Sequence, residues 1–242
     1  MRNKFQPIER ASERFFAITL LYFALVGCVG LPPVYLGVGE SSYRVLSGDT
    51  LYSIAFRHGL DYRSLAQING IAPPYTIYPN QIIRLRGSAK QVKKDRGPSA
   101  SRSAPASTLK VVKANLPASV AIWRWPLKGK VIAHFSLKNP VNKGIDIVGK
   151  AGDAVNAAAD GVVVYAGGNL RGYGKLVIIK HTDNFLSAYG NNASLAVVEG
   201  DEVKAGRTIA SVGSTEENKE MLHFEIRRDG KPVDPLLYLP PS

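Results

Sequence analysis

The sequence predicts a two-domain protein: a small α+β module of β-α-α-β order, followed by a mainly β domain with the form of a barrel-like sandwich. Residues 43–86 contain two helical segments between two short strand-like segments. Residues 121–242 alternate apolar strand-like runs with glycine-containing turns. Between them, residues 87–120 are rich in Ser, Ala, Pro and Lys, a composition typical of an extended, solvated linker.

The first 28 residues have the pattern of an export signal. A charged segment precedes the apolar run FFAITLLYFALVG, residues 15–27, and the single cysteine of the 242-residue chain, Cys28, follows. The run is too short to cross a bilayer, which takes about 20 residues, so residues 1–27 are predicted to be a signal peptide. Leu-Val-Gly-Cys resembles a bacterial lipobox, which implies lipidation of Cys28; a signal anchor with an incidental cysteine is the alternative. Val29 stands where an inner-membrane retention signal would place Asp, so the resemblance implies an outer-membrane lipoprotein facing the periplasm.

The first module, residues 43–86, has clear helix boundaries. Asp49 or Thr50 can cap its first helix, and Gly59 ends it. Asn69-Gly70 ends the second helix. The predicted elements are a strand over 43–45, a helix over 51–58, a helix over about 61–68 and a strand over 81–85.

The net charge of +12 is concentrated in the middle of the chain. Residues 87–120 carry seven basic and one acidic residue, whereas residues 121–242 carry fifteen and thirteen. Since no basic stripe is interleaved with aromatic residues, no nucleic-acid partner is expected. A basic linker suits contact with an anionic cell-wall polymer or membrane surface; a solvated linker without partners is the alternative.

The second domain, residues 121–242, contains a repeated turn-and-strand pattern. The segments 152–165 and 200–210 each begin with Gly-Asp and lead into a short apolar strand, which favours two related halves. Near its end, MLHFEIR alternates apolar Leu, Phe and Ile with polar residues, so it is predicted to be a strand with one polar face. Met221 and His223 share that face.

YRVLSGDTLYSIAFRHG, LAQING and PYTIYPNQIIRL together resemble a LysM domain. Members of that family bind glycans that contain N-acetylglucosamine, including peptidoglycan, in a shallow groove. A glycan needs backbone amides and carbonyls for its N-acetyl group and apolar surface for its sugar rings. The resemblance places these on two loops, with the residues Gly48, Asp49, Thr50, Leu51, Asn69, Gly70 and Ile71.

WPLKGKVIAHF, NKGIDIVGKAGDAVNAAADGVVVYAGG, YGKLVIIKHTDNFLSAYGN, VKAGRTIASVGS and LHFEIR resemble a lysostaphin-like (LytM) metallopeptidase domain. In active members, zinc is held by a His-x-x-x-Asp pair and the second His of His-x-His, while two further histidines assist the attacking water. Three protein ligands leave a fourth position for a water that zinc acidifies.

Most of that site is missing here. The first ligand position is Asn142, the Tyr-x-His position is Asn191, and the first His of His-x-His is Met221. Only Asp146 and His223 remain. A methionine thioether is a soft, weak donor that is unsuited to hydrolytic zinc, so no metal, no cofactor and no catalytic residue are expected. Asp146 and His223 are expected either to persist as a hydrogen-bonded pair or to belong to a groove that now binds a protein segment.

A lipoprotein with a LysM module and a degenerate LytM domain resembles the murein hydrolase activators of the NlpD/EnvC kind. The resemblance implies that the chain activates a periplasmic N-acetylmuramoyl-L-alanine amidase, a zinc enzyme, during septal peptidoglycan cleavage and daughter-cell separation. The groove expected to contact the amidase includes Asn142, Asp146, Asn191, Met221 and His223, with Arg171, Tyr173 and Lys175 at its rim. Two alternatives remain: a passive tether between outer membrane and peptidoglycan, and a zinc endopeptidase.

Overall fold

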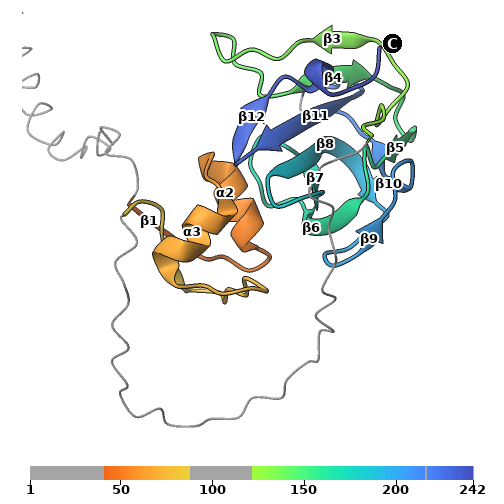
Figure 1. Ribbon diagram of the computed structural model, residues 1–242. Coiled ribbons are helices and arrows are strands. Elements are labelled where there is room, and N and C mark those ends of the chain that lie inside the picture. Colours follow the sequence, from red (N-terminus) through yellow and green to blue (C-terminus); the bar gives the residue numbers. More distant parts are fainter. Residues whose placement is uncertain (1–40, 88–121, 216, 242) are drawn as a thin grey trace, which may run out of the picture. The chain divides into compact units, whose positions relative to one another are not determined.

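The computed structural model describes residues 41–87, 122–215 and 217–241. The predicted signal peptide, Cys28 and residues 88–120 of the predicted linker lie outside these ranges. Within them, no helix is long and apolar enough to cross a membrane. Figure 1 labels the elements of the N-terminal module (residues 41–87) and of the C-terminal domain (residues 122–241).

The N-terminal module has the predicted β-α-α-β order. Its elements are β1 (Ser42–Arg44), α2 (Leu51–His58), α3 (Tyr62–Asn69) and β2 (Ile82–Arg84). The two strands pair antiparallel, with Tyr43 opposite Ile83. Their apolar side chains and those of the helices form one small core, which includes Leu51, Ile54, Ala55, Leu65 and Ile83.

Helix α2 has the predicted bounds because its ends are set by local contacts. The Thr50 hydroxyl accepts a hydrogen bond from the Ser53 amide, and the Ser53 hydroxyl accepts one from the Thr50 amide, each at 3.0 Å. This reciprocal pair satisfies two amides that have no partner within the helix. Gly59 ends α2 in the left-handed region, at φ 64°. Helix α3 begins and ends one residue later than predicted, with Asp61 as its cap.

The C-terminal domain is mainly β, as predicted, and its strands pair antiparallel. The sheet follows the order β3-β4-β11-β8-β7-β6-β9, while β10 pairs with β5 and β8, and β12 pairs with β11. The strands are β3 (Val131–Ala133), β4 (Ile145–Val148), β5 (Ala154–Asn156), β6 (Gly161–Gly167), β7 (Lys175–Lys180), β8 (Phe185–Leu195), β9 (Glu202–Val203), β10 (Thr208–Val212), β11 (Met221–Arg228) and β12 (Lys231–Val233). A short 3-10 helix, Pro235–Leu237, follows them.

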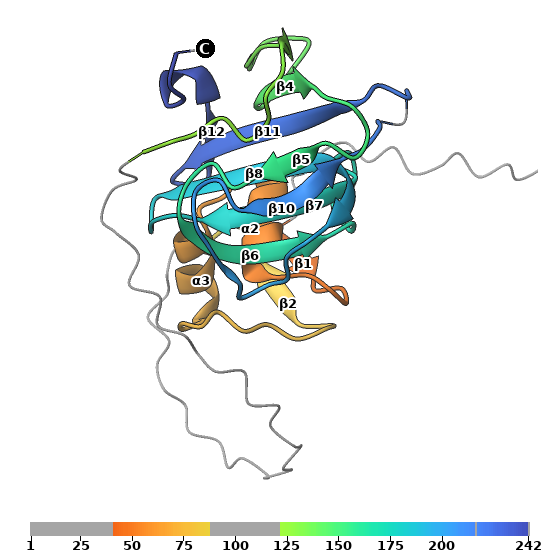
Figure 2. The same cartoon turned by 90° about the vertical axis from the view of Figure 1, so that its right-hand side faces the viewer.

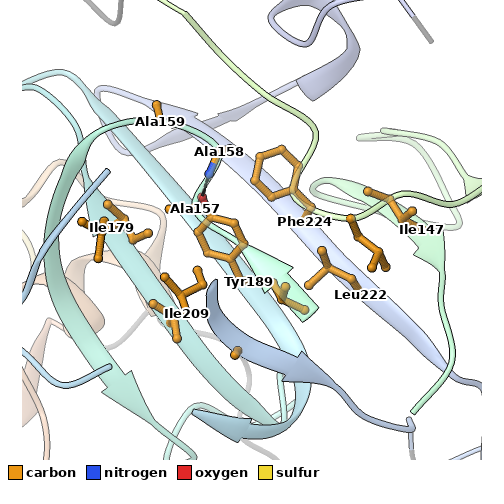
Figure 3. Close-up of a cluster of buried hydrophobic side chains, with 14 of the residues drawn as sticks. Ile147, Ala157, Ala158, Ala159, Ile179, Tyr189, Ile209, Leu222 and Phe224 are labelled. Carbon is orange, nitrogen blue, oxygen red and sulfur yellow. Dashed lines mark hydrogen bonds between the residues drawn. The ribbon is translucent and has the colours of Figure 1, made fainter. Parts of the chain in front are cut away.

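The main core lies between two layers of this domain. Strands β5 and β10 lie across the inner face of the β6-β7-β8 part of the sheet (Figure 2). Tyr189 of β8 stands at the centre, with Leu222 and Phe224 on one side and Ile179 and Ile209 on the other (Figure 3). This arrangement is the sandwich that the alternation of apolar strands predicts.

Strand β7 is buried on both faces. Its four central residues, Leu176 to Ile179, are all buried. Val177 and Ile179 belong to the main core. Leu176 and Ile178 belong to a second apolar cluster on the outer face, and that cluster contains Phe56 of α2. The described residues of the N-terminal module and of the C-terminal domain belong to one compact unit, and this second cluster contains apolar residues from both.

Candidate functional site

Strand pairing brings Asp146 and His223 side by side. Strands β4 and β11 pair antiparallel with His223 opposite Asp146. Gly144, just before β4, allows this close approach, since a Cβ atom there would lie 2.1 Å from the Phe224 carbonyl oxygen. The Nδ1 atom of His223 lies 2.7 Å from Asp146 Oδ1. The hydrogen-bonded pair expected from the two remaining ligand positions is therefore present.

The second nitrogen of His223 also meets a carboxylate. Its Nε2 atom lies 3.2 Å from Glu225 Oε1. Burial alone lowers the pKa of His223, but the hydrogen bonds with Asp146 and Glu225 outweigh burial and raise the pKa to about 9. The imidazole is thus a cation near neutral pH and donates from both nitrogens.

The chain of charges continues along β11. Arg227 Nε donates to Glu225 Oε2 at 2.7 Å, and the Tyr173 hydroxyl donates to Glu225 Oε1 at 2.7 Å. Burial raises the pKa of Glu225, but the contacts with His223 and Arg227 outweigh burial and lower the pKa to about 2. Asp146, His223, Glu225 and Arg227 therefore form a row of alternating charges, the charge row. Each buried charge in it has an oppositely charged neighbour, as burial requires.

The donors present do not fit a zinc site. A metal needs a free nitrogen lone pair from histidine, whereas both nitrogens of His223 face carboxylates. At the position predicted for the first ligand, Asn142 Oδ1 accepts from the Gly144 amide at 3.2 Å, and its buried Nδ2 atom has no hydrogen-bond partner. Among residues 41–87, 122–215 and 217–241, no group of three or more His, Cys, Asp and Glu side chains is placed to hold a metal ion.

Asn191 and Met221 line a pocket beside the charge row. It has a volume of about 350 Å³, and its other lining residues are Gly172, Gly174, Ser214, Thr215, Glu217 and Lys219. Asn191 is held in the left-handed region at φ 62°. Its amide donates to the Tyr173 carbonyl oxygen at 2.8 Å, and its own carbonyl accepts from the Gly213 amide at 2.9 Å. This pocket, named the Met221 pocket, contains Asn191 and Met221 of the residues predicted for the groove.

The predicted rim residues flank the pocket in the chain, since Gly172 and Gly174 between them are lining residues. Arg171 and Lys175 are exposed, and Lys175 Nζ donates to the Ala193 carbonyl oxygen at 2.7 Å. The Tyr173 ring instead packs edge-on against Phe56, at a centroid distance of 5.4 Å. None of the three lines the Met221 pocket.

The other histidines of this domain do not join the site. His181 is fully buried, and its Nδ1–H donates to the Asp160 carbonyl oxygen at 2.7 Å. Its Nε2 atom lies 2.6 Å from Ser187 Oγ. Burial lowers its pKa to about 4, so it is neutral at pH 7. His134 is exposed and lines a separate apolar pocket beside Trp125 and Leu239.

The residues expected to bind glycan differ in how free they are. Asn69 donates from Nδ2 to the carbonyl oxygens of Leu65 and Arg84, both at 2.8 Å, so its side chain ties α3 to β2. Leu51 is buried in the module core. Asp49 accepts from the Tyr43 hydroxyl at 2.7 Å. The remaining expected residues, whose backbone or side chains are partly or fully accessible, are Gly48, Thr50, Gly70 and Ile71.

Glu225 and Arg227 are the site residues that the sequence did not reveal. The alternation of β11 predicts a polar face open to solvent, yet both residues are buried. A sequence signal that the outer face of the sheet is covered was present in β7, because four consecutive apolar residues indicate a strand that is covered on both faces.

Comparison with known proteins identifies both parts of the chain. Residues 43–86 match the LysM domain, and residues 140–235 match peptidase family M23. A Pseudomonas aeruginosa protein, "Lipoprotein NlpD/LppB homolog", is 46% identical over 84% of this chain and 78% of its own length. The lipoprotein YgeR of Escherichia coli strain K12 is 41% identical over 96% of both chains. "Murein hydrolase activator NlpD" of the same strain is 39% identical over 83% of this chain and 68% of its own length.

These relatives match the chain across both domains at 39 to 46% identity. The resemblance to a LysM domain and to the NlpD group is thereby confirmed. The chain belongs to the NlpD/LppB family of proteins, in which a LysM domain is followed by a peptidase family M23 domain.

Proposed function

We propose that this protein is a non-catalytic activator of a murein hydrolase, namely a periplasmic N-acetylmuramoyl-L-alanine amidase. The N-terminal module binds peptidoglycan, and lipidated Cys28 anchors the chain in the outer membrane. The C-terminal domain binds the amidase and promotes septal peptidoglycan cleavage and daughter-cell separation. The observation that carries this proposal is the charge row, which uses both nitrogens of the one histidine left at the ligand positions.

The names of the relatives support the same function. One is named a murein hydrolase activator, and two are named lipoproteins. The LysM domain supports peptidoglycan as the ligand of the N-terminal module. A peptidase family M23 domain whose side chains do not fit zinc, with a pocket beside the same strand, suits a binding role.

The activator acts by binding one conformation of the amidase more tightly than another. An amidase whose site is closed by its own segment opens when a partner prefers the open state. A shift of the open population from about 1% to about 99% needs a preference of roughly 5.5 kcal/mol. The Met221 pocket supplies an adaptable apolar side chain for such a contact.

The first experiment measures dye release from labelled peptidoglycan. The mature chain carrying Cys28→Ser is added alone, or together with a purified periplasmic amidase. We expect no release by the chain alone and faster release by the mixture. Release by the chain alone that a chelator abolishes would instead indicate an endopeptidase. No effect on a competent amidase would favour the passive tether.

A matched pair of double variants tests the pocket. Arg171→Glu with Met221→Lys is expected to abolish the acceleration. The first change reverses the charge beside the pocket, and the second places a positive charge in its apolar lining. Arg124→Glu with Leu237→Lys makes the same kinds of change at exposed positions of the same domain that do not line the Met221 pocket, and should leave activation intact. Equal activation by both double variants would show that the amidase binds elsewhere.

A further inference from the structure

Phe56 is buried outside the core of its own module. It lies near the end of α2, only 2% exposed, and is absent from the module core that Leu51, Ile54 and Ala55 form. Its neighbours are residues of the C-terminal domain, including Leu176 and Ile178 of β7. A separate N-terminal module would therefore present this aromatic ring to solvent.

Arg227 makes the central polar contact with the module. Its guanidinium carbon lies 3.3 Å from the centre of the Phe56 ring, and its Nη1 donates to the Phe56 carbonyl oxygen at 2.6 Å. Lys231 Nζ donates to the Gly59 carbonyl oxygen at 3.0 Å. Two cations thus meet the carbonyl end of α2, where the helix dipole is negative.

Further polar contacts surround this centre. Arg63 pairs with Asp229 at 2.8 Å. Close backbone approach reinforces them at Gly230, where a Cβ atom would lie 2.3 Å from the Leu60 carbonyl oxygen. The module is therefore docked through apolar, cationic and backbone contacts together, and it covers Arg227 at one end of the charge row.

The same docking involves the loop that the LysM resemblance assigns to glycan. The Thr50 hydroxyl donates to the Val164 carbonyl oxygen at 3.1 Å, and Asn169 Nδ2 donates to the Ser47 carbonyl oxygen at 3.2 Å. A Cβ atom on Gly48 would lie 2.7 Å from Asn169 Nδ2, so little space separates the module from the C-terminal domain there. A sugar seated on this loop would have to displace residues 164–169.

We propose that docking of the N-terminal module and glycan binding by loop 47–50 exclude each other, so that peptidoglycan releases the module from β11. Release uncovers Arg227 and Tyr173 near the Met221 pocket and enlarges the surface offered to the hydrolase. The second part of this inference rests on the proposed function, whereas the competition itself does not. Only the free module binds glycan, so the apparent dissociation constant equals the intrinsic one divided by the undocked fraction.

The test measures binding of a hexamer of N-acetylglucosamine by calorimetry, with no hydrolase present. It uses the mature chain with Cys28→Ser, which contains no other cysteine. Lys231→Glu places a negative charge against the carbonyl end of α2 from outside the module, so the module's own core is untouched. We expect the hexamer to bind about tenfold more tightly, which corresponds to about 1.4 kcal/mol of docking free energy. Lys138→Glu, the same change at an exposed loop position, should bind like the parent chain.

A disulfide between Ser47→Cys and Asn169→Cys provides the opposite arm. The oxidised chain is expected to lose hexamer binding by at least about tenfold, and reduction should restore it. Equal affinities in the oxidised, reduced and Lys231→Glu chains would overturn the inference, as would absence of hexamer binding in all of them. Neither result decides whether the chain activates a hydrolase, because activation is measured separately by dye release.

Discussion

His181 and His223 of the C-terminal domain are in opposite charge states, so we expect the free energy of unfolding to fall at both low and high pH. Hydrogen bonds with Asp146 and Glu225 outweigh burial and raise the pKa of His223 to about 9, above its unfolded value of about 6.5. Its contribution is complete below pH 6.5 and is lost as the pH rises through about 9. Burial lowers the pKa of His181 to about 4. Its contribution is complete above pH 6.5 and is lost as the pH falls through about 4.

Urea unfolding at a series of pH values tests both expectations. In the wild-type chain, the free energy of unfolding should fall between pH 6.5 and 9. We expect His223→Gln to reduce that fall by an amount on the order of 3 kcal/mol. His181→Gln should reduce the fall in the free energy of unfolding between pH 6.5 and about 4, and leave the fall at alkaline pH unchanged. If the free energy of unfolding of His223→Gln still fell between pH 6.5 and 9, another group would have to titrate in that range.

At this scale the sequence predicted which residues share the polar face of β11 but not their surroundings. Alternation placed Met221 and His223 on one face, because side chains of a strand alternate. It could not show that Glu225 and Arg227 are buried. The group that covers Arg227 is Phe56, 171 positions away in the chain, and no local pattern records such a contact.

At the scale of the element, α2 depends on its cap. Thr50→Ala removes the acceptor for the Ser53 amide and is expected to lower the free energy of unfolding by about 1 kcal/mol. Thr50→Ser keeps a hydroxyl and should lower the free energy of unfolding by only about a few tenths of a kcal/mol. Chemical denaturation compares the two, and equal losses would show that the methyl group of Thr50, rather than its hydroxyl, matters.

The pairing of β4 with β11 depends on Gly144. Gly144→Ala forces a Cβ atom against the Phe224 carbonyl oxygen and is expected to cost about 1–3 kcal/mol. By moving Asp146 away from His223, it should also lower the pKa of His223, which NMR titration of the imidazole detects. Gly168→Ala, where no atom lies within 4 Å, is the control. An unchanged His223 titration would show that the strand pair adapts without moving the histidine.

Elements with local signals were predicted well, and those that depend on distant partners were not. Thr50 and Gly59 set the ends of α2, and both are visible in the sequence. The pairing of β10 with β5 and β8 was not predicted, because segments far apart in the sequence choose their partners through the shared core. The predicted closing strand, 81–85, is shorter in the structure, at Ile82–Arg84.

For the whole molecule, docking predicts that both folded parts unfold together. A module of this size has a small core, so contacts such as Arg227 with Phe56 contribute much of its stability. We expect a single calorimetric transition for the mature chain with Cys28→Ser. Lys231→Glu should separate an earlier transition of the module, whereas Lys138→Glu should not. Two transitions in the parent chain would show that the interface is too weak to couple them.

The double-sided burial of β7 also has a consequence for the order of events during synthesis. The N-terminal module, residues 41–87, leaves the ribosome before any strand of the C-terminal domain. Its Phe56 ring is then available when Leu176 and Ile178 first form the outer face of the sheet. We expect the ring to cover this face as the sheet forms, which shortens the time for which Leu176 and Ile178 are exposed in the newly made domain.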